Sequence, residues 1–405
     1  MSTRLSRLRT RLGGALLAAA ALLAPPALAA NNLGLETLPL TIKNNTASGK
    51  NVYVSITGMV NGNWYTVTDA KGNVARSTYS PTPRAFALNI GKATKMDLQL
   101  PQLVGMRIYV SLDKPLLVNT SPDGVPGAPA GWVPNDPNFN TIFDWAEFTW
   151  VKDGLSSLGG NLTQVDMVGM AMRIDLAGLD SDLKTPVTKS VGFAVNPNTS
   201  MRRDYFSALL KAGAPWSRLV MRDAAGKPIR VIAPYHGMEM GWFPRGQLQS
   251  YINQAYIQYA TKTLRGTSEG VTFTGRAVGR DLVFTDPKTK GTFRFPRPDS
   301  FNAYIGNFVP SPLPTDPVLE RRGRAIGALL QGAYMRTTLL TSDDLNACRK
   351  AQFYKSEPVN IYASALHALA IGGKAYAFGY DDTCEQSSYI GVHAPKSLVL
   401  TLGPL

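Results

Sequence analysis

The strongest constraint on the fold of this chain is a two-residue hydrophobic period that recurs through its first half. Apolar residues occupy every second position in the stretches 38–42, 52–56, 86–90 and 106–112. Successive side chains of a β-strand point to opposite faces of the sheet. The period therefore predicts strands that bury one face and pack as a sandwich or barrel.

The middle of the chain changes to helical spacing. Apolar and aromatic residues recur every three or four positions within 205–210, 248–259 and 319–334, with short apolar stretches between them. Alternation returns only at 397–402. A last strand so far from the first strands predicts a mainly β fold with an α/β insertion. We expect a β domain in residues 30–178, an inserted α/β domain in 179–357 and a return to the β domain in 358–405.

The N-terminus resembles an export signal. The first 14 residues contain four arginines and no acidic residue, and an uncharged apolar run follows at 15–23. Ala27-Leu28-Ala29 supplies small residues at the positions that a signal peptidase reads. Residues 1–29 are therefore predicted to be a signal peptide, and the mature protein to be secreted or periplasmic. A retained anchor is the alternative. No later run is apolar enough to predict a membrane span.

The charge excludes few partners but favours none. The formal net charge is +14, or +10 without the four arginines of the leader. A basic surface attracts nucleic acids or anionic cell walls. The sequence has no block of five basic residues and no recognisable nucleic-acid-binding module. We therefore expect no nucleic-acid partner, and a monomer.

Cys348 and Cys384 are the two cysteines of the chain. In an exported protein, a lone pair of cysteines is more often a disulfide than two free thiols. The three histidines, His236, His367 and His393, show no spacing typical of metal ligands. A disulfide is therefore predicted, and neither a metal nor an organic cofactor is expected.

Carboxylates among aromatic residues are the best candidates for chemistry. The sequence contains no nucleophile elbow, phosphate-binding loop, dinucleotide fingerprint or zinc-protease motif. Glu147 lies in the stretch Trp-Ala-Glu-Phe-Thr-Trp at 145–150, and Asp166 follows 19 residues later. An aromatic setting favours the protonated form of a carboxylic acid, which a general acid requires. The pair could face each other across a groove, or both could be ordinary carboxylates at its rim.

Four segments resemble known families. Residues 146–149 read Ala-Glu-Phe-Thr, as in thaumatin-like proteins, and 165–172 resemble their Val-Asp-Gly-Phe-Asn-x-Pro-Met segment. Residues 362–367 and 374–382 resemble the Tyr-Ala…Leu-His and Tyr-Ala-Phe-x-Tyr-Asp-Asp motifs of the bacterial β-1,3-glucanases of glycoside hydrolase family 64. The resemblance extends from about residue 38 to residue 402.

The resemblance implies a thaumatin-like β domain and an α/β domain that together form a wide groove. It implies inverting hydrolysis of β-1,3-glucan, such as laminarin, curdlan or fungal wall glucan, with release of short laminari-oligosaccharides. Glu147 corresponds to the general acid and Asp166 to the general base. Thr149 and Thr163 match hydroxyls that hydrogen-bond a sugar, Asn161 lies where many plant thaumatin-like proteins have an aspartate, and Asp381 and Asp382 match an acidic pair that lines or braces the cleft. Trp145 and Trp150 could stack on glucose rings or pack in the core, and all seven residues are candidate substrate contacts.

Two rival interpretations remain open. A thaumatin-like module could bind wall glucan without cutting it, and a secreted hydrolase with this fold could act on another polysaccharide. The spacing between Glu147 and Asp166 is a few residues longer than in the resembled family, and the eight-disulfide framework of the plant thaumatin-like proteins is absent.

Overall fold

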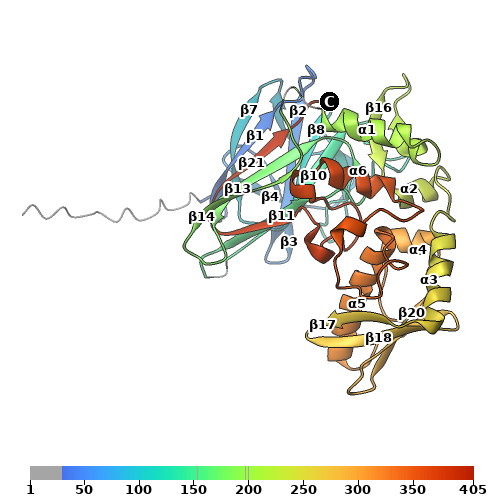
Figure 1. Cartoon of the computed structure of the whole chain (residues 1–405). Helices are drawn as coiled ribbons and strands as arrows, with labels where there is room; N and C mark the ends of the chain where they lie inside the picture. The colour runs from blue at the N-terminus through green and yellow to red at the C-terminus, as the bar shows by residue number, and fades with distance from the viewer. Residues whose placement is uncertain (1–29, 153, 197, 199) are drawn as a thin grey trace, which may run out of the picture.

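The computed structural model describes residues 30–405 except 153, 197 and 199. The predicted signal peptide at 1–29 lies outside these residues. Figure 1 shows a large curled sheet, a group of helices beside it, and a smaller α/β unit below. In the described part of the chain, no helix is long and apolar enough to cross a membrane.

Twelve strands form the large sheet, and the main path of neighbours runs β14-β13-β21-β11-β10-β8-β2-β3-β4. Strand β1 pairs with β21 and β7, and β6 pairs with β2. The strands are β1 (Thr37–Asn44), β2 (Val52–Val60), β3 (Asn63–Val67), β4 (Val74–Arg76), β6 (Leu88–Gly91), β7 (Lys95–Pro101), β8 (Val104–Leu112), β10 (Phe143–Val151), β11 (Ser157–Leu162), β13 (Met172–Leu179), β14 (Pro186–Gly192) and β21 (Ile390–Leu402).

Strand β21 curls the sheet around the core. Its first residues pair with β11, with Ile390 opposite Gly160. Its second half lies between β13 and β1, with Leu398 opposite both Leu176 and Leu40. One long strand thus joins two packed layers, as Figure 1 shows. The predominance of β structure and the return of the last strand to the first are confirmed.

The two-residue period correctly predicted the buried face of these strands. Leu38, Leu40 and Ile42 are completely buried on β1, and the apolar positions of β2 and β8 lie in the same core. Residues of this kind stabilise the fold because their apolar surface is removed from water.

The rest of the chain forms two smaller groups. One combines a three-stranded sheet with α1, α2 and α6, and the other combines a four-stranded sheet with α3, α4 and α5 (Figure 1). The elements are β12 (Met167–Val168), β15 (Val220–Arg222), β16 (Pro228–Ile232), α1 (Met201–Lys211), α2 (Pro234–Glu239) and α6 (Ile361–Leu369), then β17 (Leu264–Ser268), β18 (Val271–Val278), β19 (Asp281–Thr285), β20 (Thr292–Pro296), α3 (Gln249–Thr261), α4 (Ser300–Ile305) and α5 (Pro317–Met335). A separate two-stranded sheet pairs β5 (Ser80–Ala85) with β9 (Leu117–Thr120).

The expected domain limits need correction. The large sheet continues through β14 to Gly192 and resumes only at Ile390, so its limits differ from the expected boundaries at residues 178 and 358. After Leu162 the chain leaves the large sheet, and it returns there only at Met172, where β13 begins. The backbone of the intervening segment bonds to distant segments instead: the Gln164 N–H donates to the Tyr376 carbonyl at 2.8 Å. These contacts divert the segment that carries Asp166.

Candidate active site

Glu147 is held by two donors on one carboxylate oxygen. The Arg107 guanidinium, from the neighbouring strand β8, lies 3.1 Å from Oε1, and the Trp145 indole N–H donates to the same atom at 3.1 Å. The side chain is 36% exposed. The expected apolar setting is therefore wrong, because the carboxyl group lies beside a cation and has access to water.

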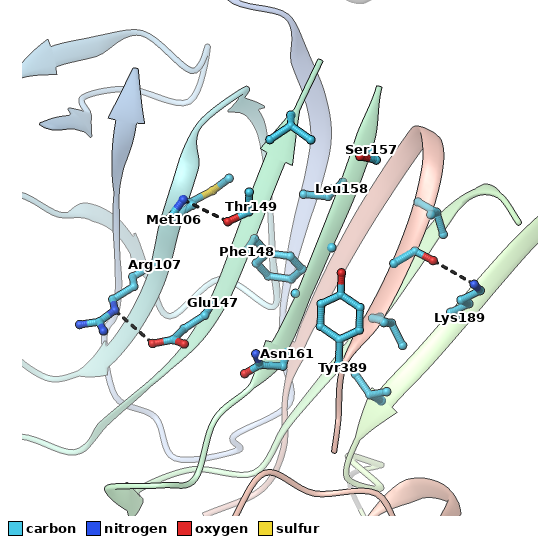
Figure 2. Close-up of a pocket in the computed structure, with 18 of the residues that line it drawn as sticks. Met106, Arg107, Glu147, Phe148, Thr149, Ser157, Leu158, Asn161, Lys189 and Tyr389 are labelled. Atoms are coloured by element: carbon cyan, nitrogen blue, oxygen red, sulfur yellow. Dashed lines mark hydrogen bonds and ion pairs between the residues drawn. The ribbon is translucent and has the colours of Figure 1, made fainter. Parts of the chain in front are cut away.

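A groove of about 1240 Å³ begins at Glu147 and continues over the outer face of the sheet. Its described lining comes mainly from β8, β10, β11, β14 and β21, and residues 193–373 contribute none of it. The floor of this groove is thus made by the large sheet rather than by the meeting of two domains. Figure 2 shows Arg107, Glu147 and Asn161 at one end, with Tyr389 and Lys189 farther across.

Two neighbouring glycines of β11 have different tasks: Gly159 keeps the groove floor open, and Gly160 makes room for the core-facing Phe148. A Cβ on Gly160 would lie 2.2 Å from the Glu147 carbonyl oxygen and 2.2 Å from the Phe148 ring. A Cβ on Gly159 would lie 2.1 Å from the Tyr389 hydroxyl. The Tyr389 side chain therefore rests over a bare stretch of β11, and it is 59% exposed. An exposed aromatic ring over a shallow floor is suited to packing against a flat ligand.

Two of the predicted sugar-binding residues line this groove. Asn161 lies directly opposite Glu147 in the β10–β11 register. Its buried Oδ1 has no hydrogen-bond partner among the described residues, so it can accept a bond from a ligand. Thr149, two residues after Glu147 on β10, accepts a hydrogen bond from the Gly105 N–H at 3.1 Å and also faces the groove (Figure 2).

Asp166 lies in the irregular segment between β11 and β12. Tyr235 and His236 both bond its Oδ1, with His236 Nε2 at 3.1 Å. Among the described residues, no hydrogen bond reaches Oδ2. Burial raises the pKa of Asp166, but the bonds from His236 and Tyr235 and the charges of His236 and Arg107 lower it by more, so its pKa lies below the ordinary value.

Arg107 connects the two candidate carboxylates. Its positive charge interacts with both Glu147 and Asp166, and these interactions contribute to raising its own pKa against the effect of burial. One guanidinium thus lies within electrostatic reach of both groups, although only Glu147 lines the groove. The two carboxylates also differ in setting, because the Asp166 side chain is 28% exposed and that of Glu147 is 36% exposed.

Asp144 ties β10 to the segment that follows Asp166. Its Oδ2 accepts the backbone N–H groups of Gly169 at 2.9 Å and Met170 at 3.1 Å. Burial raises the pKa of Asp144 to about 7, although these backbone bonds and Arg230 act in the opposite direction. Strand β10 therefore positions both carboxylates: it carries Glu147, and it anchors the neighbourhood of Asp166 through Asp144.

Three predicted sugar contacts are buried instead. Trp150 is 0% exposed, and its indole N–H donates to Ser156 Oγ at 2.7 Å. Trp145 and Thr163 are also buried. The expectation that these side chains meet a sugar is wrong in this structure, because each is covered by protein. Trp145 contributes instead by bonding Glu147.

Asp381 is a buried brace and is not part of the groove lining, which decides between the two roles expected for it. It is 0% exposed, and it bonds Arg336 Nη2 at 2.8 Å, His367 Nε2 at 3.0 Å and the Ala377 N–H at 2.9 Å. The neighbouring Asp382 is exposed but does not line the groove among the described residues. The Tyr376 segment that Asp381 holds is bonded in both directions to Gln164, close to Asp166.

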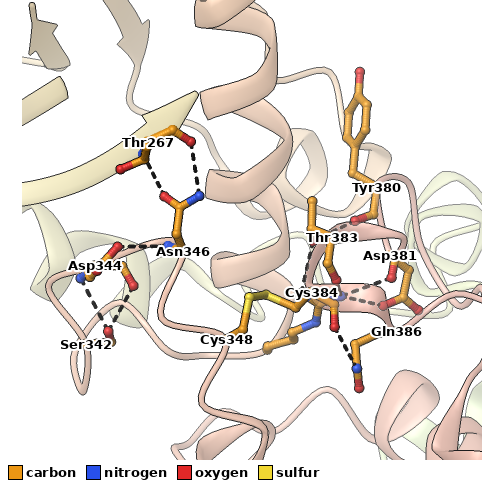
Figure 3. Close-up of a disulfide and its surroundings, with 11 residues drawn as sticks. Thr267, Ser342, Asp344, Asn346, Cys348, Tyr380, Asp381, Thr383, Cys384 and Gln386 are labelled. Carbon is orange, nitrogen blue, oxygen red and sulfur yellow. Dashed lines mark hydrogen bonds and ion pairs between the residues drawn. A yellow bond between two sulfur atoms is a disulfide. The ribbon is translucent and has the colours of Figure 1, made fainter. Parts of the chain in front are cut away.

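The predicted disulfide between Cys348 and Cys384 is confirmed, with Cα atoms 5.3 Å apart. Figure 3 shows it next to Asp381 and Thr383. It links the loop after α5 to the segment after Asp381, across 36 positions of sequence. Covalent closure of such a loop reduces the conformational freedom of the unfolded chain, so the disulfide helps to stabilise the fold around Asp381.

Sequence reasoning missed the residues that surround Asp166. Tyr235 and His236 are about 70 positions away from it, and Trp132 stacks on the His236 ring at 4.0 Å. Tyr389 was missed as well. The only sequence signal for these residues was the dipeptide Tyr235-His236, which by itself does not indicate a functional site. Within the described residues, no group of three or more His, Cys, Asp or Glu side chains is placed to hold a metal ion.

Comparison with known proteins gives a consistent result. The family model described as β-1,3-glucanase (Glyco_hydro_64) matches residues 36–402. The chain is 29% identical over 386 residues to a glucan endo-1,3-beta-glucosidase of Arthrobacter sp. (strain YCWD3), a match that covers 91% of this chain and 65% of that protein. The chain thus spans slightly less than two thirds of that relative.

Solved structures share the fold. A laminaripentaose-producing β-1,3-glucanase in complex with laminaritetraose superposes with a TM-score of 0.79 at 28% identity, covering 91% of this chain and 99% of that one. A β-1,3-glucanase domain from Clostridium beijerinckii gives 0.72 at 26% identity, with the same coverages. Because the family match extends over nearly all of the described residues, the chain belongs to glycoside hydrolase family 64, the β-1,3-glucanases.

Proposed function

We propose that the protein hydrolyses β-1,3-glucan with inversion, with Glu147 as general acid and Asp166 as general base. The observation that carries this proposal is that Glu147 lines a long open groove beside Arg107, whose charge also acts on the nearby Asp166. Hydrolysis of a glycosidic bond needs one carboxyl group to protonate the leaving oxygen and a second to activate water.

The settings of the two groups support these roles. Asp166 has a lowered pKa and a free Oδ2, as expected of a base that stays ionised and accepts a proton from water. Glu147 faces the groove, where a substrate would displace water from its carboxyl group.

Substrate class and product size rest on the relatives. A named endo-1,3-beta-glucosidase and a laminaripentaose-producing enzyme solved with laminaritetraose are both similar to this chain. We infer a β-1,3-glucan substrate, short laminari-oligosaccharide products and a thaumatin-like character of the curled sheet. The open groove can hold several sugar rings, with Tyr389, Asn161 and Thr149 as contacts. The pattern of an export signal in residues 1–29 supports secretion of the mature chain.

The test is a digest of laminarin and curdlan with the mature protein, read by oligosaccharide chromatography. We expect discrete short laminari-oligosaccharides whose newly formed ends are α-anomers by proton NMR, and no release from β-1,4-glucan. Initial β-anomers would contradict inversion. Absence of release, combined with co-sedimentation with curdlan, would favour a binding module and overturn the proposal.

Two substitutions then test the assignments. Glu147→Gln and Asp166→Asn should each lower kcat by a factor of about 100 or more, since general acid or base catalysis contributes that much. Glu320→Gln, on α5 and outside the groove, is the matched control and should behave as wild type. Near-normal rates in either active-site variant would refute that assignment.

A further inference from the structure

His236 lies between two carboxylates, only one of which has a role in the proposed reaction. Its Nε2 is 3.1 Å from Asp166 Oδ1, and its Nδ1 is 2.8 Å from Glu239 Oε2. The side chain of His236 is nearly buried, whereas that of Glu239 is 45% exposed. The chain Glu239–His236–Asp166 therefore runs from solvent to the candidate base.

Aromatic rings fix the plane of the imidazole. Trp132 stacks on it with centroids 4.0 Å apart and an angle of 18° between the planes. The Tyr235 ring lies 3.9 Å away, and its hydroxyl bonds the same Asp166 oxygen. An imidazole packed in this way has few orientations available, so its Nε2 stays directed at Asp166.

The two contacts of the ring constrain its protonation. A neutral imidazole has one N–H, whereas here both ring nitrogens face carboxylate oxygens, which accept. In acid, where the imidazole takes up a proton, both nitrogens donate and the ring is a cation beside Asp166. The titratable groups that face the ring are Asp166, Glu239 and Tyr235, and Arg107 acts on the same Asp166 carboxylate.

We propose that His236, oriented by Glu239, is a positioning residue that directs Asp166 and keeps it ionised, so that Oδ2 is free to accept a proton from the attacking water. The proposal rests on the function proposed above, with Asp166 as base. Neither His236 nor Glu239 lines the groove, so neither is expected to contact the sugar. Their substitution should therefore change kcat and the pH profile more than KM.

His236→Gln removes the imidazole whose hydrogen bond and charge lower the pKa of Asp166. We expect the acidic limb of the kcat/KM profile, which reports the base in the free enzyme, to move up by about one unit or more, because an opposite charge at this distance lowers a carboxyl pKa by that much. The kcat at the optimum should fall on the order of 10- to 100-fold through misalignment. The KM for a laminari-oligosaccharide should stay within about twofold of wild type.

Glu239 provides a second test that does not depend on a buried substitution. Glu239→Gln keeps an acceptor for the Nδ1–H and should retain most activity, whereas Glu239→Ala releases the ring and should lower kcat about tenfold at unchanged KM. Glu320→Gln and Glu320→Ala are the controls and should match wild type. Thermal unfolding of all variants separates lost positioning from lost structure.

Each outcome decides the proposal. An unshifted acidic limb in folded His236→Gln, or a Glu239→Ala enzyme equal to wild type, would overturn it. If His236→Gln does not fold, the comparison of the two Glu239 variants decides alone. Activity that survives in Asp166→Asn would instead overturn the proposed base, whereas activity lost there but unaffected at His236 and Glu239 would overturn only this inference.

Discussion

Asp381 and Asp382 are adjacent acidic residues, and we expect substitution to destabilise the protein at the first and not at the second. Replacing either by asparagine removes one negative charge and changes the side-chain size little. Asp381 is completely buried, whereas Asp382 is exposed, and no hydrogen bond of its side chain is found among the described residues. The pair therefore separates the effect of burial from that of charge.

The magnitude follows from the partners of Asp381. Arg336, His367 and the Ala377 N–H all donate to its two oxygens. Asparagine has only one acceptor oxygen, so its NH₂ group would face donors and the Arg336 guanidinium would stay buried without a counter-charge. Breaking a buried ion pair in this way costs about 3–5 kcal/mol. An exposed substitution such as Asp382→Asn usually stays within about 0.5 kcal/mol.

The assay is urea unfolding followed by tryptophan fluorescence, with laminarin cleavage measured on the folded protein. We expect Asp381→Asn to unfold at clearly lower urea, and its activity to fall because the Tyr376 segment that holds Gln164 loosens. Asp382→Asn should unfold like wild type. Stabilities within about 0.5 kcal/mol of each other, or a raised KM without loss of stability in Asp381→Asn, would refute the brace.

The remaining predictions concern the groove floor and pH. Gly160→Ala should lower the free energy of unfolding by about 1–3 kcal/mol, because its Cβ meets the backbone of β10, and calorimetry that shows no loss would contradict this. Gly159→Ala should spare stability but raise KM, because its Cβ displaces the mobile end of Tyr389, as kinetics on laminari-oligosaccharides can check. Burial lowers the pKa of His367, but its bond to Asp381 raises it by more, so the net shift is upward. The protonated His367 therefore stabilises the folded protein. This contribution is complete below about pH 6.5 and is lost as the pH rises through the folded pKa of His367. His367→Gln should remove that part of the pH dependence of unfolding.

The sequence alone determined the β architecture and the closing strand. The two-residue hydrophobic period indicates which residues share a face of a strand. The apolar face that it indicates for β1 is buried. The same period places Glu147 with Thr149 on one face of β10 and Trp150 on the other, and of the two roles open for Trp150 the structure shows packing in the core. The disulfide was also predictable, because a chain with two cysteines has a single possible intramolecular pairing.

Only the tertiary structure decided what covers each face and which distant residues meet. Trp145 shares the face of Glu147 but is buried against Trp132 and Met167, which no periodicity can indicate. The donors on Asp166 come from Tyr235 and His236, in a different segment of the chain. Local spacing fixes the direction of a side chain relative to its own strand. The charge state and reach of a carboxylate depend on neighbours that are brought together only when the whole chain packs.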